Sequence, residues 1–300
     1  MHYKNCPICS LSIKPWKNKT VNEINYNIDL CGSCGYAFVN PRPSLNFLIN
    51  YYSSLEGKID DRNEHSILYD NINLQSILAE EKVCPNSTID AKNIVNKIKS
   101  LVQKKTNSKF LDVGCGCGFF SKEALNKDFE VVALELSSKA REITKELTGL
   151  NSQRVSFEEF ENIPNSFDVI LMSHILEHAM DINLWIKKAH TLLNDQGIVA
   201  IALPNFGSIF RMIKQENEYY ILPPEHLNFF SPYSLSKLLE KNNFKVESVQ
   251  YVTRIPTGAL EKRFPKLFIP FIRPIIKLSC KVFDIFHLGL FIHIYARKIK

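Results

Sequence analysis

The sequence predicts a doubly wound α/β domain, with helices on both faces of a mostly parallel sheet, preceded by a small metal-binding module. Two observations predict the domain: strand-like apolar segments alternate with amphipathic segments from Ala91 onward, and a glycine-rich loop follows the first strand. A third, a doubled CxxC pattern, predicts the module. With 300 residues, 45% hydrophobic content and a net charge of +6, the composition excludes disorder and does not itself indicate nucleic-acid binding.

The doubled CxxC pattern predicts a zinc site. Its four cysteines form CPIC and CGSC: Cys6, Cys9, Cys31 and Cys34. Four unrelated thiols are the alternative, but this spacing favours one tetrahedral ion, and four thiolates leave no open position for catalysis. We therefore predict a structural zinc ribbon at residues 1–42. NPRPS then marks a boundary, and residues 43–90 are predicted to form a helical linker or lid.

The main domain is predicted at residues 91–300. The first helix places Ile94, Val95, Ile98, Leu101 and Val102 on one face. The later helices are expected at Phe119–Leu125, Ser138–Leu147 and Asp181–Leu193, and after Ser231, with Leu235, Leu238 and Leu239 buried. Strands are expected at 109–114, 130–136, 167–173, 197–204, 245–252 and 290–296. Such leucine-rich and β-branched strands between helices predict burial on both faces of the sheet.

The loop in FLDVGCGCGFF indicates the cofactor. Gly114, Gly116 and Gly118 follow Asp112 at alternate positions, which departs from the GxGxxG spacing of dinucleotide sites. The Asp112 carboxylate would repel a pyrophosphate but suits a cationic ligand. Glu135 ends the next strand, where an acid can accept hydrogen bonds from two ribose hydroxyls. These features together predict S-adenosylmethionine.

Four segments resemble the successive signatures of the class I S-adenosylmethionine-dependent methyltransferases: FLDVGCGCGFF, VVALELS, FDVILMSHILEH and GIVAIALPN. The resemblance implies a seven-stranded Rossmann-like sheet whose last strand is antiparallel. It also implies roles for residues at matching positions. Asp112 and the three glycines would line the methionyl part and Glu135 would hold the ribose. Glu159 and Phe160 would edge the adenine, and Ser173 and His174 would border the methyl group.

Three histidines are candidate general bases for a hydroxyl acceptor. His174 and His178 are four residues apart in SHILEH, where a capping or orienting role is the alternative. His226 lies in PPEHLNFFSPYSL, and a bond to its own turn is the alternative there. This segment and CGYAFVNPRPS resemble a subset of these methyltransferases from bacterial polysaccharide and secondary metabolism, including sugar methyltransferases. The resemblance implies a hydroxylated, sugar-linked acceptor.

An insert at residues 254–288 mixes basic and apolar residues. Between Arg254 and Lys281 it holds seven basic residues and one acidic residue, Glu261, with prolines at 265, 270 and 274. This composition suits a segment on anionic lipid or a lid over a phosphate-bearing substrate. A packed lid or a dimer face is the alternative. The prolines predict against one long regular helix.

The lead hypothesis is a small-molecule methyltransferase, with O-methylation of a sugar favoured over C-methylation. The alternatives are a zinc-ribbon RNA methyltransferase and a noncatalytic cofactor-binding scaffold. Nucleic acid is not the expected partner, because the basic residues of the ribbon are scattered. The first residues lack a signal-peptide pattern, so a cytoplasmic location is expected, with peripheral membrane contact through the insert as an option.

Overall fold

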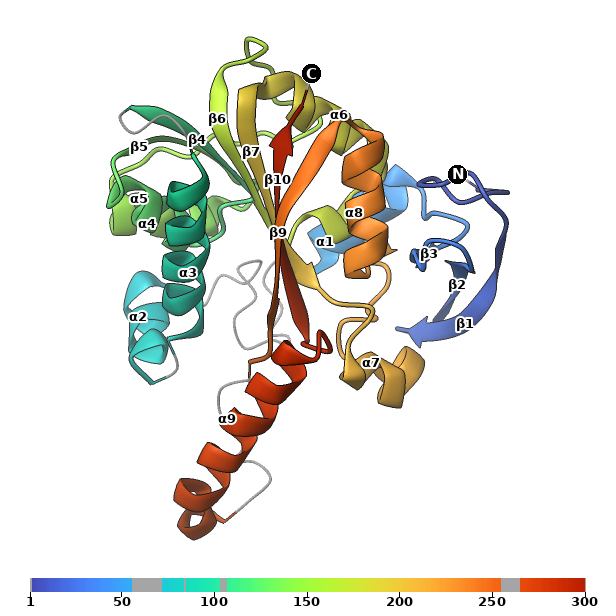
Figure 1. Cartoon of the computed structure of the whole chain (residues 1–300). Helices are drawn as coiled ribbons and strands as arrows, with labels where there is room; N and C mark the ends of the chain where they lie inside the picture. Colours follow the sequence, from blue (N-terminus) through green and yellow to red (C-terminus); the bar gives the residue numbers. More distant parts are fainter. Residues whose placement is uncertain (1, 56–71, 84, 103–106, 255–264, 300) are drawn as a thin grey trace.

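The computed structural model describes residues 2–55, 72–83, 85–102, 107–254 and 265–299. A central sheet has the strand order β5-β4-β6-β7-β10-β9 (Figure 1). Its strands are β4 (Ser108–Val113), β5 (Phe129–Leu134), β6 (Phe167–Ser173), β7 (Leu193–Pro204), β9 (Phe244–Val252) and β10 (Phe291–Lys298). β10 runs antiparallel to both of its neighbours, which confirms the predicted fold class. The resemblance implied seven strands, whereas the described residues form a sheet of six, with one further parallel bridge between Leu134 and Gln153.

Helices cover both faces of the sheet, as the alternating pattern predicted. One face packs against α3 (Asn86–Leu101), α4 (Phe119–Leu125) and α5 (Ser138–Thr148), with α2 (Leu74–Val83) beside α3. The other face packs against α6 (Ile182–Leu192) and α8 (Pro232–Lys241), whose buried side chains include Ile186 and Leu238. Ser231 caps α8 through a capping box, with Pro232 in the first turn.

The amino-terminal segment forms a second, antiparallel sheet in the order β1-β2-β3-β8. Its strands are β1 (Ile13–Val21), β2 (Ile24–Cys31), β3 (Ala37–Val39) and β8 (Asn228–Phe229). β8 comes from the methyltransferase-like part of the chain, directly after His226. The predicted ribbon is therefore joined to that part by strand pairing. Helix α1 (Leu45–Leu55) follows the ribbon, and the domain boundaries themselves stay predictions.

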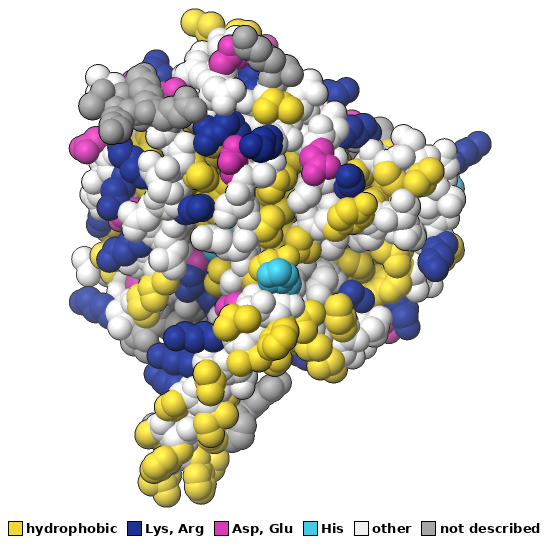
Figure 2. Space-filling model, in the orientation of Figure 1, with side chains coloured by type: hydrophobic (Ala, Val, Ile, Leu, Met, Phe, Trp, Pro, Cys, Tyr) yellow, Lys and Arg dark blue, Asp and Glu magenta, His cyan; other side chains and the backbone are white. Residues whose placement is uncertain are grey.

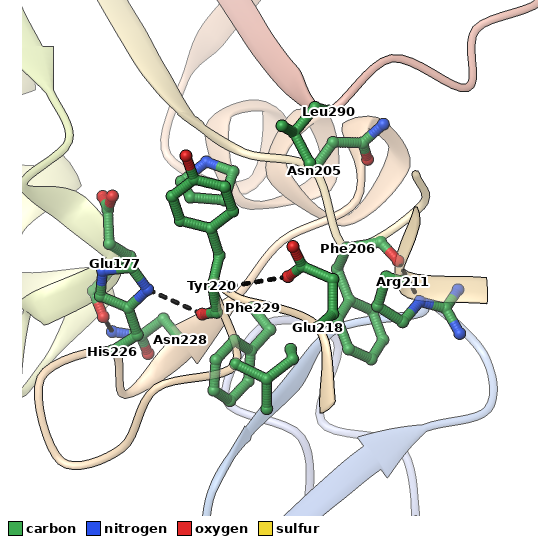
Figure 3. A pocket seen from close by; sticks show the side chains of 12 residues that line it. Glu177, Asn205, Phe206, Arg211, Glu218, Tyr220, His226, Asn228, Phe229 and Leu290 are labelled. Carbon is green, nitrogen blue, oxygen red and sulfur yellow. Dashed lines mark hydrogen bonds between the residues drawn. The ribbon is translucent and has the colours of Figure 1, made fainter. Parts of the chain in front are cut away.

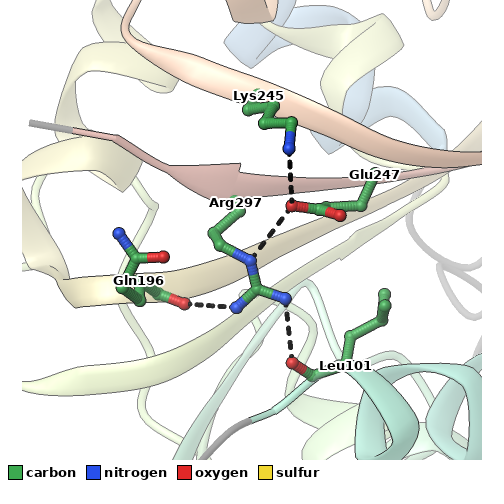
Figure 4. A network of polar contacts seen from close by, with 5 residues as sticks. All are labelled: Leu101, Gln196, Lys245, Glu247 and Arg297. Atoms are coloured by element: carbon green, nitrogen blue, oxygen red, sulfur yellow. Dashed lines mark hydrogen bonds and ion pairs between the residues drawn. The ribbon is translucent and has the colours of Figure 1, made fainter.

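A polar network around Arg297 connects strands of the sheet at the edge opposite the glycine loop (Figure 4). From β10, the guanidinium of Arg297 donates to the carbonyls of Gln196 (2.9 Å) and Leu101 (3.0 Å) and to Glu247 Oε1 (3.1 Å). These partners belong to β7, the end of α3, and β9. The reversed strand is thus held to both neighbouring strands and to a covering helix.

The insert contains a helix that projects from the body of the molecule (Figure 1). A short turn, η3 (Lys266–Phe268), leads into α9 (Ile269–Ile285), while Lys262 and Arg263 lie outside the described residues. The expectation that prolines would prevent one long helix was wrong. Pro270 occupies the first turn, where its missing N–H costs nothing, and only Pro274 lies inside the helix.

Candidate functional site

The three loop glycines adopt backbone conformations that other residues rarely reach. Their φ angles are +68° at Gly114, +54° at Gly116 and +81° at Gly118. A Cβ on Gly114 would lie 2.9 Å from Ile175 Cδ1, and one on Gly118 would lie 2.9 Å from Thr144 Cγ2. The loop therefore needs glycine both for conformation and for space. It turns tightly from β4 into α4 at the carboxyl edge of the sheet, where ligands bind in such folds.

Glu135 is held against this loop. Its carboxylate accepts hydrogen bonds from the Gly116 N–H (3.0 Å) and the Ser137 N–H (2.8 Å). The residue is only 9% exposed, and burial raises the pKa of its carboxyl. An acid in this position retains lone pairs for hydroxyl donors. This arrangement fits the predicted ribose contact.

Asp112 is fully buried at the end of β4. Its carboxylate accepts a hydrogen bond from Ser121 Oγ at 2.6 Å. Burial raises the pKa of Asp112 to about 7, with the charge of Glu135 adding to the effect. A buried carboxylate without a cationic partner is unfavourable. A cationic ligand bound in the glycine loop would supply that partner, so Asp112 fits S-adenosylmethionine.

The predicted adenine contacts are placed less favourably. Glu159 is exposed and accepts a hydrogen bond from Ser156 Oγ at 2.9 Å. Phe160 is 3% exposed, and its ring packs against Phe167 in the core. Their contact with adenine stays a prediction. Ser173 ends β6 and is half-buried at the carboxyl edge, and its contact with the methyl group stays a prediction as well.

The three candidate histidines gather around Glu177, which is 2% exposed. His174 Nδ1 lies 3.5 Å from Glu177 Oε1. His178 and His226 meet edge to face with ring centroids 4.9 Å apart. Burial alone would raise the pKa of Glu177, but pairing with His174 and the positive charges that the other two imidazoles carry in acid solution lower it to about 2. Glu177 is thus a buried anion shared by three imidazoles.

Backbone carbonyls fix the tautomers of two of these histidines. His178 Nδ1 donates to the Glu225 carbonyl and His226 Nδ1 donates to the Tyr220 carbonyl, each at 2.8 Å. Because a carbonyl only accepts, both Nδ1 atoms carry the proton and both Nε2 atoms keep a lone pair. Burial lowers the pKa of both rings, so they are neutral near pH 7. Each is therefore available as a base. Together with Glu177, whose ligand atoms lie within 4.8 Å of theirs, they could also hold a divalent cation.

A small hollow of about 10 Å³, enough for about one water molecule, lies beside His226 (Figure 3). Glu177 and His226 stand on one side of it, and Glu218, Arg211 and Phe206 stand on the other. The lining is mixed, since the remaining side chains are Pro204, Asn205, Tyr220, Ile221, Asn228, Phe229 and Leu290. His226 is thus the candidate base that borders this small hollow.

The amino-terminal module holds the segment that carries His226. Arg42, 4% exposed, donates to the Leu227 carbonyl at 2.5 Å, to the Tyr36 hydroxyl at 3.3 Å and to Asn228 Oδ1. Its guanidinium therefore binds the two residues that follow His226. In the sequence, Arg42 is part of the NPRPS boundary. Its buried contact with Leu227, 185 residues further along the chain, leaves no local signal there.

The four predicted zinc ligands come together. Cys6 Sγ lies 3.6 Å from Cys34 Sγ, Cys9 Sγ lies 3.4 Å from Cys31 Sγ, and all four sulfurs are within 4.8 Å of one another. A tetrahedral zinc with bonds of about 2.3 Å spaces its sulfurs about 3.8 Å apart. The hydrogen bond from Cys34 lowers the pKa of Cys6 to about 5. The donor set fits a structural Zn²⁺ held by Cys6, Cys9, Cys31 and Cys34.

Comparison with known proteins agrees with this geometry. Residues 89–249 match the family model described as methyltransferase domain, and the chain belongs to that family. The protein is an S-adenosylmethionine-dependent methyltransferase. It is 30% identical over 163 residues to the ubiquinone biosynthesis O-methyltransferase of Pelagibacter ubique, covering 51% of this chain and 68% of that relative. It is 28% identical over 153 residues to the protein of the same name from Bartonella tribocorum, covering 47% and 61%.

Solved structures support the fold alone. The crystal structure of a SAM-dependent methyltransferase from Archaeoglobus fulgidus superposes with a TM-score of 0.53 at 19% identity, over 74% of this chain and 99% of that one. Phosphoethanolamine N-methyltransferase 2 from Haemonchus contortus gives a TM-score of 0.51 at 15% identity, over 95% and 71%. The finer sugar-methyltransferase assignment is not supported by these comparisons.

The raised pKa of Asp112 predicts that cofactor binding depends on pH. Its pKa of about 7 in the free protein means that, below pH 7, a cationic cofactor must displace a proton. We expect the Kd for S-adenosylmethionine to rise about tenfold between pH 8 and pH 6. Isothermal titration calorimetry at several pH values measures this. Asp112→Asn, which cannot titrate, should bind weakly at every pH; a flat profile for the wild type would contradict the role of Asp112.

The cysteine cluster predicts that replacing one of its cysteines lowers zinc content, stability and turnover together. Cys6→Ser should lower the zinc content from about one ion per chain and lower Tm by about 10 °C, since losing a structural metal costs on the order of 4 kcal/mol. Turnover should fall as well, because the module holds the His226 segment through Arg42 and β8. Elemental analysis and thermal unfolding measure the effects. Cys280→Ser changes a buried cysteine outside the cluster and is the control.

Proposed function

We propose that this methyltransferase methylates a hydroxyl oxygen of a small acceptor, with His226 as the general base. The observation that carries the proposal is the position of His226: it borders a hollow, its tautomer is fixed by the Tyr220 carbonyl, and Glu177 lies beside it. O-methylation is favoured over C-methylation because a neutral imidazole matches the modest basicity that a hydroxyl requires.

In this mechanism the chain's own residues align the acceptor and manage one proton. S-adenosylmethionine supplies a methyl group activated by its sulfonium. The acceptor oxygen forms a bond to the methyl carbon as the carbon–sulfur bond breaks, and the hydroxyl proton moves to Nε2 of His226. The resulting imidazolium is stabilised by Glu177, which stays ionised because its pKa is about 2. S-adenosylhomocysteine and the methyl ether are the products.

The first acceptor class that we propose is a sugar, in particular a nucleotide-linked sugar used in surface-glycan biosynthesis. The charged side chains of the lining support this, since Arg211 can donate hydrogen bonds to hydroxyl groups and Glu218 can accept hydrogen bonds from them. A phenolic hydroxyl is the second candidate. The names of the two relatives, both ubiquinone biosynthesis O-methyltransferases, favour it.

An RNA acceptor has less support. Bases stack on exposed aromatic side chains. In the amino-terminal module, however, Tyr36 and Phe38 are fully buried and stacked on each other, and Tyr36 also packs against Phe230. Trp16 packs edge to face on Phe206. These rings hold the module to the rest of the protein, which supports a structural role for the module.

The proposal is tested by transfer of labelled methyl from S-adenosylmethionine. Purified protein is incubated with three fractions of a cell extract: nucleotide sugars, lipids and RNA. Label in the nucleotide-sugar fraction supports the sugar, and label in an ether-extractable phenol supports the second candidate. Label confined to RNA would overturn the acceptor class. Asp112→Asn protein serves as the background control.

A further inference from the structure

Helix α9 carries an exposed apolar face. Its side chains are between 40% and 72% exposed and follow a spacing of four, three, four and three residues, which places them on one side of a helix: Phe271, Ile275, Leu278, Val282 and Ile285. Figure 2 shows hydrophobic side chains covering the projecting end of the molecule. A continuous apolar face of this kind, exposed on the protein surface, indicates a contact with a binding partner.

The other side of α9 and its carboxyl end are fixed to the body. Cys280 is buried on that side, and Phe283 packs edge to face on Phe210 of α7 (Ile209–Lys214). Asp284 accepts a hydrogen bond from Thr253 Oγ1 at 2.6 Å, just past the end of β9. A Cβ on Gly289 would lie 2.6 Å from Asp284 Oδ1, so the connection is tight. Helix α9, called the arm below, is therefore fixed at its carboxyl end, and its apolar face points away from the body of the protein.

The arm leaves the sheet at the edge that carries the candidate active site. β9 runs parallel to β7, because β10 is antiparallel to both, so the connection through α9 lies at the carboxyl edge. Phe291, which begins β10, packs on His174 (5.3 Å between centroids) and on Tyr220 (5.1 Å). Whatever the arm contacts therefore lies on the same side as the histidine cluster.

The charges of α9 distinguish a lipid surface from a second copy of the chain. Lys277 and Lys281 are exposed one turn apart beside the apolar face, and the only acidic residue of the helix, Asp284, is bonded to Thr253. An isologous pair of such helices would bring two sets of cations together without acidic partners. Anionic lipid headgroups supply the missing charge.

We propose that α9 docks this methyltransferase on an anionic membrane surface, with the helix in the interface and the active-site edge facing the lipid. No helix in the described part of the chain is long and apolar enough to cross a membrane. α9 would instead bury its apolar face at the headgroup boundary while its cations contact the phosphates. The docking does not depend on which hydroxyl acceptor is used.

Flotation of the full-length protein with vesicles tests the proposal. We expect binding to vesicles of phosphatidylcholine that contain about 30% phosphatidylglycerol, and weaker binding to vesicles of pure phosphatidylcholine. F271D/L278D should abolish binding to both. K277E/K281E should reduce binding to the anionic vesicles more than about tenfold, because each cation near the surface contributes about 1 kcal/mol. Raised salt should imitate the charge variant.

Matched controls keep the result specific to α9. Ile163→Asp changes an equally exposed apolar residue elsewhere, and K145E/K187E reverses two exposed lysines on α5 and α6. Both should bind vesicles as the wild type does, and all variants should bind S-adenosylmethionine normally. Failure of the wild type to bind anionic vesicles at low salt would overturn the proposal. So would a wild-type dimer in sedimentation that F271D/L278D converts to a monomer without any vesicle binding.

Discussion

Glu135→Gln is expected to weaken S-adenosylmethionine binding at least about 100-fold. Charge-assisted hydrogen bonds contribute about 1.5–3 kcal/mol each, and two ribose hydroxyls would lose them together, at about 1.4 kcal/mol per tenfold change. The amide would also turn an NH₂ group toward a donor, because Glu135 already accepts from the Gly116 and Ser137 N–H groups. Calorimetric titration of the purified variant measures the Kd.

The control for this prediction is Glu142→Gln, on the exposed surface of the neighbouring helix α5, where the glutamate pairs with Lys139. It should bind the cofactor as the wild type does. A thermal unfolding curve without cofactor separates loss of binding from loss of the loop, since Glu135 also orders Gly116. A Kd for Glu135→Gln within about threefold of wild type would remove Glu135 from the ribose contact.

Local pattern was sufficient for most of the main domain. The apolar runs predicted each central strand, and the helical faces predicted the covering helices. Ser231 with Pro232 predicted the start of α8, because helix capping depends on residues that are neighbours in the sequence. The pairing of β3 with β8 was not predictable. It joins Ala37 to Phe229, and nothing in the two short segments indicates that they meet.

The same limit applies to the candidate site. The loop glycines, Glu135 and the four cysteines are fixed by spacing, and the structure brings each set together. The role of Glu177 has no local signal, because it depends on His226, a residue far along the chain, folding back beside it. Phe160 was placed at the adenine by resemblance, but its spacing equally suits a core ring, and it is buried against Phe167.

His226→Asn is expected to lower kcat about 100-fold to 10,000-fold, the usual range for loss of a general base, while leaving the Kd for S-adenosylmethionine unchanged. Asparagine can still donate to the Tyr220 carbonyl from its amide, so the segment should keep its position. It has no basic nitrogen for the hydroxyl proton. Steady-state assays with labelled cofactor and an identified acceptor give kcat, and single-turnover assays give the rate constant of methyl transfer itself.

The pH profile separates a base from a positioning residue. Burial lowers the pKa of His226 below its usual value of about 6.5, so the neutral, active form persists into mildly acidic solution. At a saturating concentration of S-adenosylmethionine, where the titration of Asp112 no longer limits binding, the wild-type rate should be flat above about pH 7 and should fall only on the acid side. His226→Asn should lose that acid limb, whereas His178→Asn should keep it if His178 only supports the cluster. An acid limb that survives in His226→Asn and vanishes in His178→Asn would transfer the base to His178, whose Nε2 has the same freedom.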